Sequence, residues 1–300
     1  MPPPHGHVVT PIYRNERGHP VHEGSAVLFR SSHKHWIATS AHCLTGDDPL
    51  WLPGVPSFHE LPGPIIQSPE VLDLAYAELS GGAVEALERN GHSFLDHDKI
   101  SLAKIDPKAV RCSISGYPEP SVEIHEDKGE VIVDPFIITT CFFSENEQTG
   151  LGENRHVQIA AKLDGCRGPN GERLSKFPWR GLSGGAIWSI VPDKGPRLVG
   201  IVTMHDPSRR ALIGTRIGPL IREIAHRLSA ELSPAIVLPK GYIDHNPQKA
   251  PWYPIGEVPP DELVEILLPN GLECEARLGL DGWSSGSGIL NPIAWRRRQV

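Results

Sequence analysis

The sequence predicts an all-β protein that carries one substantial helix. Runs of β-branched or alternating apolar residues dominate the first 217 positions. Glycine and proline number 30 each and separate these runs, as tight turns between short strands require. Strands do not alternate with helices along the chain, so the pattern does not favour a parallel α/β sheet.

The predicted strands are short and are bounded by Gly, Pro, Asp or Asn. We expect them at residues 24–31, 35–40, 71–79, 110–116, 130–143, 157–162, 184–191, 197–204 and 211–217. A helical patch at 81–91 interrupts the series and is typical of an insertion between strands.

A longer amphipathic helix follows the last of these strands. Its apolar residues fall on one face at helical spacing, while charged residues occupy the other faces. The apolar set is Ile217, Leu220, Ile221, Ile224 and Leu228.

The composition then changes and divides the chain into three parts. We expect a main domain at residues 1–232, a Pro-rich linker at 233–253 and a small β-rich appendage at 254–300. Within the appendage, apolar residues alternate on both sides of Asn270-Gly271, a dipeptide that favours a hairpin turn. Because two strands alone are marginally stable in water, the hairpin needs a third strand at 289–295 or contact with the main domain.

The composition also excludes several classes of protein. An apolar content of 39% and a charged content of 22% exclude a disordered chain. A net charge of −7 argues against nucleic acid as a partner, and no apolar run is long enough to span a membrane. The five cysteines form no CxxC motif and no secretory leader is visible, so we expect free thiols in a cytoplasmic protein.

Three segments far apart in the chain carry residues that could act together in catalysis. His42 ends an apolar strand that begins at Trp36, Asp73 lies within the apolar run 71–75, and Ser183 is flanked by glycines. A serine hydroxyl is barely ionised at neutral pH, so it needs an imidazole to accept its proton during attack. The imidazole in turn needs a carboxylate that fixes its tautomer and stabilises its charged form.

These segments resemble the trypsin-like (chymotrypsin-fold) serine peptidases. The sequences S-A-H-C at 40–43, D-L-A at 73–75 and G-L-S-G-G at 181–185 stand in that family's order of His, Asp and Ser. Supporting motifs are G-S-A-V-L-F at 24–29, I-S-G-Y-P at 114–118, L-V-G-I-V at 198–202 and G-T-R-I at 214–217. The resemblance spans roughly residues 20–230, and the short interval between His42 and Asp73 is closer to compact bacterial members than to secreted digestive enzymes.

The resemblance implies a fold of two six-stranded antiparallel β-barrels with the active site between them. It implies that His42 is the general base, that Asp73 orients it and that Ser183 is the nucleophile. The amides of Gly181 and Ser183 would then form the oxyanion hole, where glycines let the backbone approach the substrate closely.

The resemblance further implies a substrate-binding edge and a primary pocket. Backbone groups of Thr203, Met204 and His205 would pair with the substrate as an added strand. The base of the pocket would be Phe177, with Leu212 near the opposite wall. Neither residue is acidic, so we expect a small or apolar preference and no preference for Lys or Arg.

Two departures from the family pattern bear on activation. Leu182 stands where extracellular members carry an Asp that pairs with a newly cut amino terminus, so we expect no activation by that kind of clipping. The cysteine that usually bridges to the one after the histidine would lie near Val27 and is absent, so Cys43 is expected to be an unpaired core thiol.

Each of these residues also has a less specific interpretation. His42 alone could be a core or surface histidine, and Asp96 or Asp98 could compete with Asp73 for its role. G-L-S-G-G also fits the nucleophile elbow of α/β-hydrolase esterases, but that elbow needs a strand before the serine and a helix after it. The run A-I-W-S-I-V after Ser183 is strand-like, which argues against the elbow.

The remaining alternative is a protease-fold module that binds peptides without cleaving them. A complete set of His, Asp and Ser argues against it. The 15 histidines follow no metal-ligand spacing, so we expect neither a metal nor a cofactor. We expect a protein or peptide substrate, and we hypothesise that a regulatory protein binds the appendage at 254–300.

Overall fold

Two largely antiparallel β-sheets position the candidate site. The structure is a computed structural model that describes residues 6–31, 34–45, 49–53, 58–61, 65–68, 72–102, 105–125, 130–133, 135–144, 147, 157–168, 170–174, 179–191, 195–232, 253–254, 263–267, 273–279, 282–285, 288–290 and 294–297. The chain divides into two compact units, Met1–Gly218 and Pro219–Val300. The predicted linker lies almost entirely outside the described residues, so the domain boundaries at 232 and 253 stay predictions.

The first sheet has eight strands and contains the strand that leads to His42. Its order is β5-β4-β1-β2-β3-β7-β6, and β8 pairs in parallel with β2. The strands are β1 (Val9–Glu16), β2 (His19–Ser31), β3 (Lys34–Ser40), β4 (Leu50–Leu52), β5 (His59–Glu60), β6 (Ile66–Gln67), β7 (Leu74–Glu78) and β8 (Leu95–Asp96). The sequence did not predict β1, because Pro11, Arg14 and Asn15 interrupt its apolar pattern.

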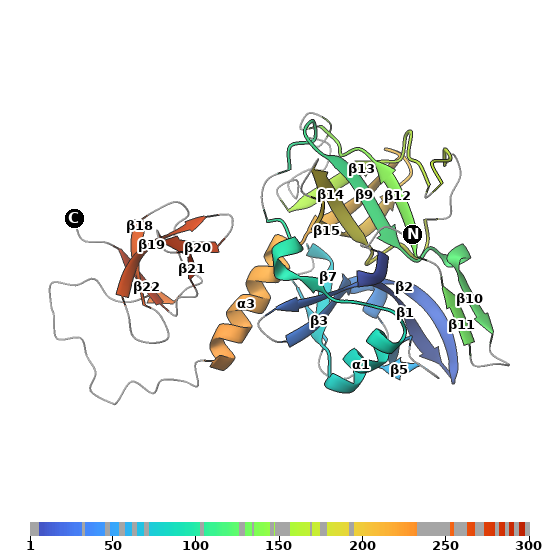
Figure 1. The fold of residues 1–300 in the computed structure, drawn as a ribbon, viewed down its shortest axis with the longest axis horizontal. Helices are drawn as coiled ribbons and strands as arrows, with labels where there is room; N and C mark the ends of the chain where they lie inside the picture. The colour runs from blue at the N-terminus through green and yellow to red at the C-terminus, as the bar shows by residue number, and fades with distance from the viewer. Residues whose placement is uncertain are drawn as a thin grey trace. The chain divides into compact units, whose positions relative to one another are not determined.

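The second sheet has six strands and contains the strand that follows Ser183. Its order is β12-β9-β14-β15-β16-β13. The strands are β9 (Arg111–Gly116), β12 (Phe136–Thr140), β13 (Gln158–Lys162), β14 (Ala186–Val191), β15 (Gly195–Asp206) and β16 (Ala211–Arg216). In the view of Figure 1 this sheet, coloured green to gold, lies above the blue to cyan first sheet.

The two sheets confirm the all-β prediction, but neither closes into a continuous barrel. β12 and β13 are the two outermost strands of the second sheet, and the residues that follow β12 approach β13. Phe142 forms an isolated bridge with Ala161, and the amide of Phe143 donates to the carbonyl of Ala160 at 2.9 Å. The outermost strands therefore meet there without forming a ladder.

The predicted strand at 130–143 is wrong in one respect, because it is two strands. β11 (Glu130–Val133) pairs with β10 (Val122–His125) as a separate two-stranded sheet, and only β12 joins the larger sheet. Pro135 lies between β11 and β12 and has no amide hydrogen to donate to a ladder, which is consistent with the break at this point.

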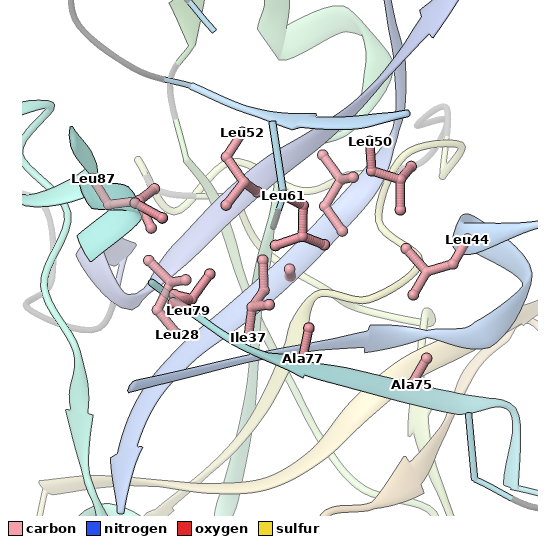
Figure 2. Close-up of a cluster of buried hydrophobic side chains, with 13 residues drawn as sticks. Leu28, Ile37, Leu44, Leu50, Leu52, Leu61, Ala75, Ala77, Leu79 and Leu87 are labelled. Carbon is pink, nitrogen blue, oxygen red and sulfur yellow. The ribbon is translucent and has the colours of Figure 1, made fainter. Parts of the chain in front are cut away.

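Each sheet has its own hydrophobic core. The core of the first sheet includes Leu28, Ile37, Leu52 and Leu87, each no more than 2% exposed (Figure 2). The second core gathers residues such as Ile114, Ile138 and Ile187. Burying each such side chain stabilises the fold by about 1.5–3 kcal/mol.

Both predicted helices are present. The patch at 81–91 forms α1 (Gly81–Arg89), where the Ser80 hydroxyl accepts a hydrogen bond from the Ala83 amide and caps the helix. The longer helix is α3 (Gly218–Leu232), and Leu220, Ile221, Ile224 and Leu228 are buried along its predicted apolar face. Within the described residues, no helix is long and apolar enough to cross a membrane.

The C-terminal region forms a six-stranded sheet of its own. Its order is β17-β22-β18-β19-β20-β21. The strands are β17 (Tyr253–Pro254), β18 (Leu263–Leu267), β19 (Glu273–Gly279), β20 (Gly282–Ser285), β21 (Gly288–Leu290) and β22 (Ala294–Arg297). β18 and β19 are the predicted hairpin, and β22 supplies a third strand beside β18.

Candidate active site

His42 lies at the surface immediately after a buried strand. β3 ends at Ser40, and the short 3-10 helix Ala41–Leu44 turns the chain so that the His42 side chain is 47% exposed. The Thr45 hydroxyl donates to the His42 carbonyl at 2.8 Å and closes the turn. The imidazole is therefore carried by a short hydrogen-bonded turn and is accessible to a substrate.

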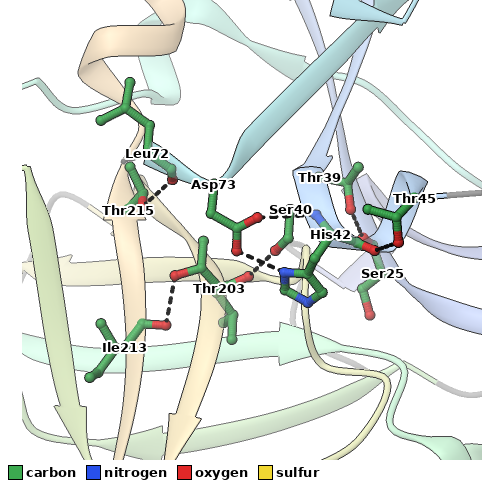
Figure 3. A network of polar contacts seen from close by, with 11 residues as sticks. Ser25, Thr39, Ser40, His42, Thr45, Leu72, Asp73, Thr203, Ile213 and Thr215 are labelled. Atoms are coloured by element: carbon green, nitrogen blue, oxygen red, sulfur yellow. Dashed lines mark hydrogen bonds and ion pairs between the residues drawn. The ribbon is translucent and has the colours of Figure 1, made fainter. Parts of the chain in front are cut away.

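Asp73 contacts His42 at two points (Figure 3). One carboxylate oxygen, Oδ2, lies 2.7 Å from His42 Nδ1, and the other, Oδ1, accepts from the His42 amide at 3.0 Å. Because an ionised carboxylate only accepts hydrogen bonds, the proton of the neutral ring lies on Nδ1 and the lone pair on Nε2. This tautomer is the one that a general base needs.

The backbone of Asp73 adopts a conformation that few side chains tolerate. Its φ is +46°, in the left-handed region. Hydrogen bonds hold it there: the Asp73 carbonyl accepts from the Ala41 amide at 3.0 Å, and the Leu72 carbonyl accepts from the Thr215 hydroxyl at 2.6 Å. Strained conformations of this kind persist where the surroundings fix them and are frequent at active sites.

The electrostatic surroundings favour the charged form of His42. The hydrogen bond with Asp73, followed by one with Cys43, raises the pKa of the His42 imidazole above its usual value of 6.5, while partial desolvation opposes the shift. The carboxylate thus stabilises the imidazolium that forms when His42 accepts a proton.

The loop that carries Ser183 is tied to the strand that precedes His42. The carbonyl oxygen of Val202 accepts two hydrogen bonds, one from the Ser40 hydroxyl at 2.6 Å and one from the Gly184 amide at 2.7 Å. Ser40 lies two residues before His42, and Gly184 directly follows Ser183. A single oxygen atom therefore joins both segments.

Two glycines allow this close approach. A Cβ atom at Gly24 would lie 2.8 Å from both Cys43 Sγ and the Ser183 carbonyl oxygen. A Cβ atom at Gly184, where φ is +83°, would lie 1.8 Å from the Ser25 carbonyl oxygen. Any side chain at either position would force these segments apart.

The structure thus brings His42 and Asp73 into direct contact and places the Ser183 backbone beside the residue that follows His42. Among the contacts of the described residues, the Ser183 hydroxyl makes no hydrogen bond with the imidazole. Its role as nucleophile remains a prediction. Asp96 is not a competitor for Asp73, because its carboxylate pairs with Arg30.

The backbone amides of the serine loop fall into two groups. Those of Leu182, Gly184 and Gly185 donate to carbonyls of Trp179, Val202 and Leu182. The amides of Gly181 and Ser183 donate to no acceptor among the described residues. The two amides expected to form the oxyanion hole therefore have no partner in this part of the protein.

The predicted substrate-binding edge is a stretch of β15 that, among the described residues, pairs with a strand on one side only. The pairing of β14 with β15 ends at Ala186 and Ile201, whereas β16 continues along β15 to Asp206. Within the described part of the chain, Met204 and His205 thus have a strand partner on the β16 side only, and Thr203 lies at an irregularity in the β15–β16 register. Met204 is 47% exposed there.

Leu212 is the residue of the predicted primary pocket that lies among the described residues. Leu212 is 1% exposed and belongs to the core of the second sheet, opposite His205 in the β15–β16 register. The centroids of the Trp179 and His205 rings lie 5.8 Å apart. Phe177 lies outside the described residues.

Cys43, Cys112, Cys141 and Cys166 are free. Cys43 is buried, as expected for an unpaired core thiol. Ser25 and Thr215 also contribute hydrogen bonds to the site, and the sequence did not predict these contacts. The signal that could have found them is their place in the motifs at 24–29 and 214–217.

Comparisons with known proteins found chains similar to this one among solved structures. No family model matches the chain, and no curated protein matches it. Among solved structures, neuropsin, a serine protease expressed in the limbic system of mouse brain, is 16% identical over 76% of this chain and 96% of its own, with a TM-score of 0.47. Kallikrein-related peptidase 10 is 18% identical over 76% of this chain and 98% of its own, also with a TM-score of 0.47.

Proposed function

We propose that the protein is a serine endopeptidase that cleaves peptide bonds through an acyl-enzyme. The observation that carries the proposal is the two-point contact between Asp73 and His42, 2.7 and 3.0 Å, on a segment tied to the Ser183 loop through Val202. A carboxylate that fixes the Nδ1 tautomer of an exposed imidazole is the arrangement that activates a nearby hydroxyl.

The reaction follows from the roles of these groups. His42 Nε2 takes the Ser183 proton as the hydroxyl oxygen attacks the substrate carbonyl, and the amides of Gly181 and Ser183 stabilise the oxyanion. The imidazolium then gives its proton to the leaving amine as the peptide bond breaks. Water attacks the acyl-enzyme with His42 again as the base, which releases the acid product and restores Ser183.

An extended peptide is the substrate that the predicted substrate-binding edge of β15 would accept. Residues Thr203, Met204 and His205 would donate and accept main-chain hydrogen bonds in the manner of an added strand. With Leu212 buried on β16 opposite His205, we propose a small or apolar side chain at the primary position. Phe177 is proposed as the base of that pocket.

The second candidate is a binding module that holds peptides without cleaving them. The absence of a hydrogen bond between the Ser183 hydroxyl and His42, among the described contacts, is the observation that favours it. An α/β-hydrolase esterase has no such support, because strand β14 follows Ser183 and the surrounding sheet is antiparallel.

We also propose that the protein works in the cytoplasm and is controlled by another protein. The free state of Cys43, Cys112, Cys141 and Cys166 is compatible with a reducing compartment. Leu182 cannot form an ion pair with a new amino terminus, so control by a partner at residues 254–300 is the proposed alternative to clipping.

A peptide-library digest tests the proposed function. The wild type and Ser183→Ala are incubated with peptides of random sequence, and new amino termini are identified by mass spectrometry. We expect cleavage after small or apolar residues by the wild type alone. Peptide binding without cleavage would favour the binding module, and cleavage after Lys or Arg would refute the proposed preference.

A further inference from the structure

Ser25 lies at the centre of the hydrogen bonds that hold the Ser183 loop. The residue is 0% exposed. Its hydroxyl accepts from the Tyr117 amide and donates to the Gly181 carbonyl, both at 2.8 Å. Its own amide donates to the Ser183 carbonyl at 2.8 Å, and its carbonyl accepts from the Thr39 hydroxyl at 2.7 Å.

We propose that Ser25 is a positioning residue for the oxyanion hole. Its hydroxyl holds the peptide group between Gly181 and Leu182 in the orientation that leaves the amides of Gly181 and Ser183 free for a substrate oxyanion. This inference rests on the proposed peptidase function, because it assigns Ser25 to the same site.

The orientation of the two free amides follows from the hydrogen bonds of their own peptide groups. In a trans peptide the C=O and N–H point in opposite directions. The Arg180 carbonyl accepts from the Glu119 amide at 2.9 Å, so the Gly181 N–H points away from Glu119. In the peptide group between Leu182 and Ser183, the Leu182 carbonyl accepts from the Gly185 amide, so the Ser183 N–H points away from Gly185.

The peptide group between these two is the one that Ser25 holds. Its carbonyl, on Gly181, accepts from the Ser25 hydroxyl, and its amide, on Leu182, donates to the Trp179 carbonyl at the longer distance of 3.2 Å. Rotation of this group would change the dihedral angles at Gly181 and Leu182, on which both free amides depend. The Ser25 hydroxyl therefore fixes the middle of the loop.

The loop needs such a constraint because Gly181 is conformationally permissive. Its φ is +88°, and a glycine can leave this conformation at little steric cost. The Ser25 hydroxyl uses its single donor on Gly181 and an acceptor lone pair on Tyr117, so the bond directions are fixed. Without the hydroxyl, the buried Gly181 carbonyl and the buried Tyr117 amide each lose a hydrogen bond. Rotation of the peptide group after Gly181 would allow its carbonyl to find another donor.

Ser25→Ala and a matched control, Ser113→Ala, test the proposal in the full chain. Ser113 lies in β9 and is 1% exposed, and its hydroxyl donates to the Ile138 carbonyl of β12 at 2.9 Å. Ser113→Ala therefore also removes a buried hydrogen bond from a hydroxyl to a carbonyl. For an amide substrate, Ser25→Ala is expected to lower kcat about tenfold or more with KM within about twofold. The upper limit is the roughly 10²–10³-fold cost of losing one oxyanion donor. Ser113→Ala is expected to leave both constants near wild type.

Amide hydrogen exchange of the same proteins supplies a measurement that does not need activity. In the wild type, the Tyr117 amide should exchange slowly and those of Gly181 and Ser183 rapidly. Ser25→Ala should speed exchange at Tyr117 and change the signals of Gly181 and Ser183, whereas Ser113→Ala should not.

The outcomes separate this proposal from the proposed function. An unchanged kcat in Ser25→Ala, or protected Gly181 and Ser183 amides in the wild type, overturns the role of Ser25. The second measurement holds even if Ser25→Ala does not fold. If the wild type shows no hydrolysis that depends on Ser183, but Ser25→Ala alone alters the loop amides, the peptidase function fails and the positioning of the loop by Ser25 is supported.

Discussion

The Asp73 carboxylate acts on His42 through geometry and charge together. It holds the ring at Nδ1 and raises the pKa of the imidazole. A general base works only in its neutral form, so the activity of the wild type should rise as pH increases through the pKa of His42. The midpoint of that rise should lie above 6.5.

Asp73→Asn tests this coupling. The amide can donate to Nδ1 and so favours the wrong tautomer, and a change of this kind is expected to lower kcat by about 10⁴-fold. Because the negative charge is lost, the pKa of His42 should also fall, and the midpoint of any residual activity should move to lower pH. The pH dependence of kcat/KM measures both effects, and an unmoved midpoint would show that Asp73 does not act on His42.

At the scale of the element, the turn before β14 depends on a glycine that no other residue can replace. Gly184 has a φ of +83°, and a Cβ atom there would overlap the Ser25 carbonyl. Gly195 has a similar φ of +71° at the start of β15, with nothing within 4 Å of its Cβ position. The two glycines share a backbone conformation and differ in the space around them.

Gly195→Ala is therefore the matched control for Gly184→Ala. Strain alone should cost Gly195→Ala about 1–2 kcal/mol of the free energy of unfolding. Gly184→Ala carries the same strain and must also displace β2 or the loop, so it should be less stable and inactive. Urea unfolding compares the two, and equal stabilities would contradict the close packing of the loop against Ser25.

The two loops of the site differ in how far the sequence could predict them. The pairing of His42 with Asp73 followed from three short motifs in a known order. The hydrogen bonds of Ser25 did not, because they join residues 92 and 156 positions apart and follow no local pattern. The break between β11 and β12 has a local cause, because Pro135 interrupts a run that is otherwise rich in β-branched residues.

At the scale of the whole molecule, the sequence predicted an all-β architecture, two helices and a C-terminal hairpin, and the structure contains them. It did not predict β1, where Pro11, Arg14 and Asn15 interrupt the apolar pattern. It also did not predict β4, β5 and β6, because strands of two or three residues are too short to show an alternating pattern. The compact bacterial type, the pocket at Phe177 and the domain boundaries stay predictions.

Deletion of residues 254–300 tests the proposed regulation. If a partner acts through this sheet, the shortened chain should differ from the full chain in its activity or in the complexes it forms in a lysate. Size-exclusion profiles and hydrolysis rates measure both. Identical behaviour of the two chains would contradict a regulatory role for the appendage.

The central claim is that His42 activates Ser183 for attack. Labelling of the full chain with a fluorophosphonate, followed by mass spectrometry of the modified peptide, tests it most directly. We expect the wild type to be modified at Ser183, Ser183→Ala not at all and His42→Ala only very slowly. A folded wild type that stays unlabelled, or a His42→Ala variant labelled at the wild-type rate, would contradict the claim.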